Sequence, residues 1–176
     1  MSAVAADLEA GLAAHRGAVE EFASRAARVG PDAWARPPAP EKWSPAELTE
    51  HLRLALAAVA QELAGGAGMR PVLPGWTRLL LRWSVLPRIL GGGWFPKGAR
   101  APRETRPTAP DGDPTQALRR LAAELERYES ICRACPPRAR LTHPYFGRLP
   151  LARANRLLAA HARHHAGQLP PSTEET

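Results

Sequence analysis

The sequence is poor in cysteine and in long apolar runs, and both shortages exclude whole classes of protein. Its 176 residues include two cysteines, too few for the disulfide framework of a small secreted domain. No run of 18 apolar residues occurs, so no segment is expected to cross a membrane. Acidic side chains such as Asp7 and Glu20 interrupt the first apolar pattern, which is unlike a signal or transit peptide. We therefore expect a cytoplasmic protein.

Lysine is scarce as well. Only Lys42 and Lys97 among the 24 basic residues are lysines, and the formal net charge is +7. A basic surface attracts nucleic acid, anionic lipid or an acidic substrate. The arginines are spread along the chain and are not gathered in one run, so no nucleic-acid partner is expected. The expected substrate is a small molecule.

The motifs of several common enzyme classes are missing. No glycine-rich phosphate loop follows a strand, and no GxSxG motif is present. The motif "CRAC" at residues 132–135 has the spacing of a redox pair, but it ends a predicted helix, where the helix dipole opposes formation of a thiolate. Cys132 also continues an apolar stripe. We therefore interpret both cysteines as packing residues.

Four segments carry apolar residues at alternating steps of three and four, the period of a helix with one buried face. The first segment stops at Gly30 and Pro31. The second begins after the N-cap Ser44, with Pro45 at the first helical position and Glu47 completing a capping box. The four stripes are Leu8, Leu12, His15, Val19, Phe22, Ala26, Val29; Leu48, Leu52, Ala55, Val59, Leu63; Leu118, Leu121, Leu125, Tyr128, Cys132; and Leu151, Ala154, Leu158, His161, His165, Gln168.

These stripes predict an all-α protein, a four-helix bundle in a single domain over residues 1–170. The third helix is expected to begin after Asp113 and the fourth after Pro150. A Trp/Pro/Gly-rich insertion at 65–112 separates the second and third helices, and residues 171–176 are expected to form a disordered tail. No strand of useful length is predicted.

The insertion carries the segment "WTRLLLRWSVLPRIL" and then, from 91 to 112, a sequence that resembles irregular loop. Four large apolar residues of the segment would share one face of a short helix: Trp76, Leu79, Trp83 and Leu86. Two interpretations stay open. The face covers the bundle or completes a homodimer interface, or residues 74–90 lie on an anionic membrane. In the second case, three arginines would meet lipid phosphates: Arg78, Arg82 and Arg88.

Histidines are concentrated near the C-terminus, in "LLAAHARHHAGQL". His161 and His165 lie one helical turn apart, on the face that also carries Leu158. Two imidazoles that point into a bundle either hydrogen-bond to buried partners or hold a metal, since HxxxH on one helix face is a chelating geometry. His51, at the edge of the second stripe, is the best candidate for a third ligand.

The other histidines have less specific interpretations. His15 falls on the first buried stripe and is interpreted as a core residue, with a supporting position beside a ligand as the alternative. His164 flanks the pair, as an alternative ligand or a solvated residue. His143, in the loop "THPYFG", is expected to cap a turn with Pro144.

Two motifs together resemble the DinB/YfiT-like metal-binding four-helix bundles. One is "KWSPAELTEHL" at 42–52, and the other is "HPYFGRLPLARANRLLAAHARHHAGQL" at 143–169. The resemblance covers roughly 1–64 and 113–170 and leaves the insertion outside. It implies that His51, His161 and His165 ligate one divalent metal, zinc or nickel. It also implies a chemistry, because characterised relatives include transferases and isomerases that use a low-molecular-weight thiol such as mycothiol or bacillithiol.

A metal held by three imidazoles keeps at least one position open, as catalytic zinc does. Such an ion produces hydroxide from water, which implies a hydrolase, or thiolate from a bound thiol, which implies an S-transferase. The sequence does not choose between the two. Glu47, one turn before His51, is the candidate general base, with the capping box as its alternative role. Gln168 is a candidate for orienting a ligand ring, and Tyr145 for placing a hydroxyl at the mouth of the site.

A rival interpretation from another class is a non-catalytic helical bundle. Its histidines would bind metal weakly or not at all, and the insertion would mediate contact with a partner or a membrane.

Overall fold

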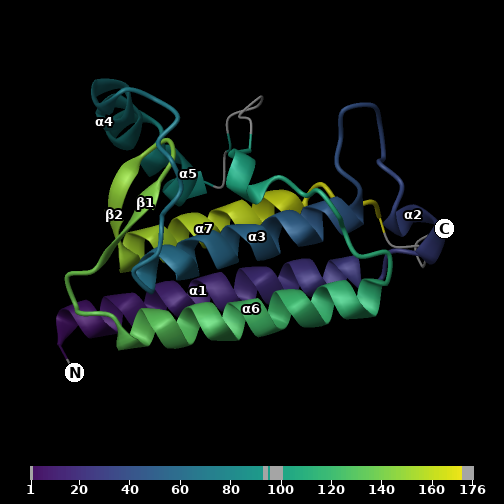
Figure 1. The fold of residues 1–176 in the computed structure, drawn as a ribbon, viewed down its shortest axis with the longest axis horizontal. Coiled ribbons are helices and arrows are strands. Elements are labelled where there is room, and N and C mark those ends of the chain that lie inside the picture. The colour runs from purple at the N-terminus through teal and green to yellow at the C-terminus, as the bar shows by residue number, and fades with distance from the viewer. Residues whose placement is uncertain (1, 93–94, 96–100, 172–176) are drawn as a thin grey trace.

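The computed structural model describes residues 2–92, 95 and 101–171, and it is mostly helical with one small two-stranded sheet (Figure 1). The all-α expectation therefore holds broadly. The predicted disordered tail lies outside the described residues except at Pro171. The elements in chain order are α1 (Ala3–Ala26), α2 (Pro31–Trp34), α3 (Pro45–Leu63), α4 (Gly75–Ser84), α5 (Leu86–Gly92), a 3-10 turn η1 (Arg103–Thr105), α6 (Pro114–Ala134), β1 (Arg140–His143), β2 (Gly147–Pro150) and α7 (Leu151–Ala166).

The four long helices α1, α3, α6 and α7 run along the long axis of the molecule (Figure 1). α1 packs along α7, and α3 packs along α6. At Gly11 of α1, an added Cβ would lie 2.9 Å from the carbonyl oxygen of Ala152 on α7. A side chain larger than hydrogen therefore does not fit there, and the glycine allows the two helices to approach closely.

The predicted starts of α3 and α6 are confirmed by their caps. The Ser44 hydroxyl accepts a hydrogen bond from the backbone N–H of Glu47, and the Glu47 carboxylate accepts one from the backbone N–H of Ser44. Asp113 caps α6 by accepting from the N–H of Thr115. α1 ends at Ala26, slightly before the last apolar residue of its stripe, yet Val29 is still buried.

The apolar stripes of the long helices meet in one core. The largest fully buried side chains include Trp34, Tyr128, Phe22, Leu12, Leu48 and Leu121. Trp34 lies in the short helix α2 and donates its indole N–H to the carbonyl of Asp111 at 2.9 Å, so the loop before α6 is joined to the segment that follows α1.

The prediction that no strand occurs is wrong, because β1 and β2 form an antiparallel hairpin. Leu141 and Leu149 lie opposite each other on its buried face. Gly147 has a φ of +69°, which favours glycine and lets the chain turn within a short loop. The N–H of Thr142 donates to the carboxylate of Glu62, which ties the hairpin to the end of α3.

The insertion is more helical than the sequence suggests. α4, α5 and η1 lie within it, and they occupy the side of the molecule opposite to α1 and α6 (Figure 1). Leu86 is buried in α5, but Trp76, Leu79 and Trp83 of α4 are exposed. The interpretation that this face covers the bundle is therefore wrong for α4. None of the helices in the described part of the chain combines the length and the hydropathy that a membrane span requires.

Candidate metal centre

His51 reaches the space between α3 and α7 from the second turn of α3. Its side chain is buried, and its Nδ1 lies 2.7 Å from the carbonyl oxygen of Thr105 in η1. A carbonyl only accepts, so Nδ1 carries the hydrogen and Nε2 carries the free lone pair. The capping box that starts α3 one turn earlier fixes the position of this histidine along the helix.

His161 and His165 reach the same space from α7. The Nδ1 of His165 lies 2.8 Å from the side-chain oxygen of Gln168, which again only accepts, so the Nε2 of His165 also carries a lone pair. The amide nitrogen of Gln168 donates to the Nε2 of His164 at 3.0 Å. Gln168 therefore orients a ring of the HxxxH pair, as its position in the stripe suggested.

The three Nε2 atoms point at one another. The Nε2 of His161 lies 3.1 Å from that of His51 and 2.9 Å from that of His165, and the three candidate ligand atoms all lie within 4.8 Å of one another. His161 can donate at most one hydrogen from Nε2, but it faces two acceptors. At least one of the Nε2 lone pairs therefore stays unsatisfied unless a cation lies between the nitrogens.

The chemistry of this donor set fits a divalent ion. Two nitrogen ligands on a tetrahedral zinc ion stand roughly 3.3 Å apart when the bonds are about 2.0–2.1 Å long. The Nε2 separations of His161 from His51 and from His165 are only a few tenths of an ångström shorter, and the third pair of ligand atoms lies within 4.8 Å. Two of the three rings are also held at Nδ1 by an acceptor, which is the usual second contact of a metal-binding imidazole.

Burial keeps these imidazoles neutral. It lowers the pKa of His51, although the hydrogen bond to Thr105 opposes the shift. Burial, with the neighbouring histidines, lowers the pKa of His161 far below its ordinary value and that of His165 to about 3. A shared proton is therefore disfavoured at neutral pH, and the neutral rings are in the form that binds metal.

Aromatic side chains wall the histidine cluster. The ring of Trp43, just before α3, lies 4.7 Å from the ring of His51 and 6.2 Å from that of His165. Phe95 lies 5.8 Å from His161 and stacks on His164 at 4.9 Å. His161 is partly exposed, so solvent reaches the cluster on its side. A ligand that enters there meets apolar walls and converging nitrogens.

Other candidates from the sequence lie outside this group. His15 makes its ring contact with Tyr128. His164 bonds to Gln168, away from the three Nε2 atoms. His143 ends β1, accepts from the N–H of Tyr145, and stacks on Phe146, so its role in the turn is observed. Burial lowers the pKa of His143 to about 4.

Glu47 is held in the capping box by its bond to the N–H of Ser44. Within the described part of the chain, no hydrogen bond joins its carboxylate to the three histidines. The CRAC cysteines are free thiols, and burial raises the pKa of Cys132 to about 11 and also raises that of Cys135. Both are therefore protonated at neutral pH, which suits their interpretation as packing residues.

Sequence reasoning missed three contributors to the site: the walls Trp43 and Phe95 and the carbonyl of Thr105. Trp43 stands in the quoted "KWSPAELTEHL" motif, so it carried a signal. Phe95 and Thr105 lie in the insertion, which had no recognised pattern, and Thr105 meets His51 across 54 residues of chain. A contact of that kind depends on tertiary structure alone.

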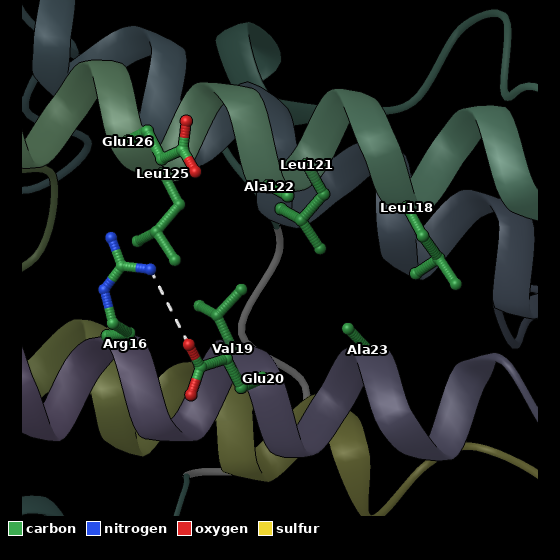
Figure 2. A pocket seen from close by; sticks show the side chains of 9 residues that line it. All are labelled: Arg16, Val19, Glu20, Ala23, Leu118, Leu121, Ala122, Leu125 and Glu126. Carbon is green, nitrogen blue, oxygen red and sulfur yellow. Dashed lines mark ion pairs between the residues drawn. The ribbon is translucent and has the colours of Figure 1, made fainter.

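A second concave region lies between α1 and α6 (Figure 2). Its floor is apolar, with Val19, Leu121 and Leu125, and Arg16 pairs with Glu20 at its edge at 3.6 Å. Among the described residues that line it, none is a histidine or a cysteine, and its carboxylates are those of Glu20 and Glu126. The groove shares no residue with the histidine cluster.

Fold and site together define the class of protein: a mostly helical chain with a three-histidine group that can hold a metal ion. A family model adds the relationship, since the model of the DinB superfamily matches residues 14–169. The chain belongs to the DinB superfamily. No curated protein and no solved structure matches it at a significant level.

Proposed function

We propose that this chain is a metal-dependent enzyme of the DinB type that acts on a small molecule. Its metal is held by His51, His161 and His165, and zinc or nickel suits three neutral imidazoles. The four long helices would form the four-helix bundle of the family, residues 1–170 would act as one domain, and residues 65–112 would supply walls of the site. The observation that carries the proposal is the convergence of three Nε2 atoms with surplus lone pairs.

The reaction we favour is the transfer of a low-molecular-weight thiol of the mycothiol or bacillithiol kind to an electrophilic substrate. A bound divalent ion supplies a Lewis acid that lowers the pKa of a thiol or water on its open position. Around it, Trp43 and Phe95 exclude water and offer surfaces for an apolar substrate. Thr105 and Gln168 hold two of the rings in the tautomer that points Nε2 inward.

Hydrolysis is the less favoured reaction because it calls for a base that takes a proton from water. Glu47 is the candidate base, and its carboxylate is already engaged by the N–H of Ser44. It could serve only if it released the cap. A cytoplasmic location is part of the proposal, since the thiols named above are intracellular reagents of the relatives that the sequence resembles.

Elemental analysis of protein purified without an affinity tag tests the first step. We expect about one divalent ion per chain in the native protein, and none in His51→Ala or His161→Ala. His164→Ala is the matched control, because this neighbour lies on the same helix and bonds away from the cluster, so it should keep the metal. Absence of metal from the native protein, even after incubation with zinc or nickel, would contradict the proposal.

A thiol-conjugation screen tests the second step. Native protein is incubated with a thiol and a panel of electrophiles, with and without a chelator. Conjugation that needs the metal supports transfer, and release of product without thiol supports hydrolysis instead. Equal rates with and without chelator would contradict metal dependence. A protein that holds the metal but accelerates no reaction would contradict the enzymatic part of the proposal, and weak or absent metal binding would support the rival interpretation of a non-catalytic bundle.

A further inference from the structure

The helix α4 turns its apolar side toward solvent. We call Trp76, Leu79, Leu80 and Trp83 the α4 face. These side chains are 73%, 56%, 58% and 75% exposed, respectively. In a 100° helical repeat they fall within one stripe, so they form a continuous surface. Figure 1 shows α4 beyond β2, on the side away from α1 and α6. Exposed apolar patches of this kind mark interaction sites.

The opposite side of α4 holds the helix in place. Arg82 donates to the carbonyl oxygen of Arg148 in β2 at 3.2 Å, and the guanidinium of Arg78 lies beside Gly147 at the end of the turn. Leu81 packs against the core, and α5 follows at once with Leu86 and Ile89 fully buried. α4 therefore has a fixed orientation in which its cations face the protein and its tryptophans face out.

The elements that α4 contacts, α5 and β2, contain arginine and no acidic residue. Residues 63–92 contain no aspartate or glutamate, and neither do residues 130–171, which include the hairpin. The exposed basic residues closest to α4 along these segments are Arg70, Arg88 and Arg148. Glu62 borders the region, but its carboxylate accepts from the N–H of Thr142 and lies against the loop at Gly68. The 17 acidic residues of the chain lie in other segments.

We propose that the α4 face docks on the surface of an anionic lipid bilayer. Tryptophan and leucine on one side of a short helix insert at the level of the headgroups, where the indole ring is favoured. The arginines that flank the helix then lie near lipid phosphates and are attracted by the negative surface potential. The helix lies in the interface and does not cross it, in agreement with its length of 10 residues.

The same features disfavour a second copy of the chain as the occupant. A twofold contact between two α4 faces would bring two acid-free segments together, and like charges repel. The four side chains offer on the order of 500 Å², less than the roughly 800 Å² that each partner contributes to a standard interface. Nucleic acid would pair with the arginines but would leave two exposed tryptophans and two leucines without an apolar partner.

Vesicle flotation tests the proposal with the full-length protein. The probes are vesicles of phosphatidylcholine alone and of phosphatidylcholine mixed with phosphatidylglycerol, at low and at high salt. We expect co-flotation with the mixed vesicles, weaker binding at high salt, and a blue shift of tryptophan fluorescence on binding. The double variant Trp76→Ser/Trp83→Ser should lower the partition coefficient by at least about tenfold. Arg88→Glu should weaken binding to the mixed vesicles less strongly.

Val4→Ser is the matched control, because Val4 is 54% exposed on α1 and lies outside the α4 face; its partition coefficient should not change. Thermal unfolding should be unaltered in all variants, since the replaced side chains are exposed. The proposal is overturned if the native protein floats with neither vesicle at low salt, or if the double tryptophan variant binds as well as the native chain. It is also overturned if light scattering shows a native dimer that this double variant dissociates, because the face then joins two copies.

Discussion

Among the described residues, two clusters of polar side chains are built around buried members, and they differ in how their hydrogen bonds are satisfied. The histidine cluster, His51, His161 and His165, lies between α3 and α7. The Glu129 cluster lies where α1, α6 and α7 meet. Its members are His15, Arg16, Tyr128, Glu129, Arg133 and Asn155.

In the Glu129 cluster, nearly every donor has an acceptor. The buried carboxylate of Glu129 accepts two hydrogen bonds from Arg16, at 3.0 and 2.9 Å, and one from Arg133 at 3.1 Å. Tyr128 donates to the side-chain oxygen of Asn155, which donates in turn to the carbonyl of Leu151. Within this cluster, the Nδ1 of His15 is the buried atom that has no hydrogen-bond partner among the described residues. Such a network joins helices and asks for no ligand.

In the histidine cluster, the Nδ1 atoms of two rings have hydrogen-bond acceptors, whereas the Nε2 atoms face one another. Thr105 and Gln168 take the Nδ1 hydrogens of His51 and His165, and both Nε2 lone pairs then face His161. Burial of unmatched acceptors is costly, and a cation bound between them would remove that cost. Burial of polar side chains alone therefore does not indicate a binding site. A surplus of hydrogen-bond acceptors that converge on one point indicates one.

The largest expected effect falls on the Glu129 cluster and on stability. Burial raises the pKa of Glu129, but hydrogen bonds from Arg16 and Arg133 outweigh it and hold the pKa below its ordinary value. Glu129→Gln should therefore lower the free energy of unfolding by roughly 3 kcal/mol at pH 7. Because the folded-state pKa is depressed, the part of this stability that depends on the charge of Glu129 is present above the unfolded pKa and is lost as the pH falls through the folded one. Urea denaturation measures it.

Glu20→Gln is the matched control for that variant. Glu20 pairs with the same arginine at 3.6 Å, but its side chain is 63% exposed, so the change should stay within about 0.5 kcal/mol. Metal content should be unaltered in both variants. Loss of the metal in Glu129→Gln, without loss of the fold, would mean that the two clusters are coupled. The conclusion that the Glu129 cluster has no part in metal binding would then be wrong.

Acid should protonate His15 of the Glu129 cluster, whose Nδ1 has no hydrogen-bond partner among the described residues. Burial lowers the pKa of His15 from 6.5 to about 4, so the unfolded chain takes up the proton first. The stability that neutral His15 provides is present above pH 6.5 and is lost as the pH falls to about 4. The difference in unfolding free energy between native protein and His15→Leu should change by about 2 to 3 kcal/mol over that window. A constant difference would show that His15 is already charged or hydrated in the fold.

Gln168→Ala tests whether the contact between Gln168 and His165 supports metal affinity. It removes the acceptor of the His165 Nδ1 hydrogen, and loss of such a supporting contact costs about tenfold or more in metal affinity. Competition with a chromophoric chelator measures this. Gln168→Glu keeps an acceptor oxygen and should retain the affinity, and Arg163→Ala, an exposed change on the same helix, should leave it unaltered. Unchanged affinity in Gln168→Ala would mean that the ring needs no anchor.

The sequence predicted those features that depend on local pattern. The caps at Ser44 and Asp113 and the apolar stripes place the long helices, and the four-residue spacing of His161 and His165 places both rings on one side of α7. The hairpin was not predicted because each strand has only four residues, too few for an alternating pattern to be recognised. Its glycine indicates a turn but does not distinguish a hairpin from other turns.

Features that depend on distant contacts could not be predicted. From the sequence alone, Glu129 resembles a solvated helix residue. Its burial depends on Arg16 of α1, which lies 113 residues away in the chain. The carbonyl of Thr105 has no sequence signal at all. The exposure of the α4 face was only one of two predicted alternatives, because an apolar stripe normally indicates burial, whereas here the arginines of the helix are on the side that packs.

The smallest expected effect separates the two roles of Glu47. Glutamine also completes a capping box, since its amide oxygen can accept from the N–H of Ser44. Glu47→Gln should therefore change the unfolding free energy by no more than about 0.5 kcal/mol, and metal affinity should stay the same. Ser44→Ala, which removes the other half of the cap, should cost about 1 kcal/mol. Any loss of thiol transfer or hydrolysis in Glu47→Gln must then come from the missing carboxylate, because the cap, the helix and the metal are intact. A tenfold fall in metal affinity would instead indicate that Glu47 contacts the metal or its ligands. The proposal that three histidines alone hold the metal would then be wrong.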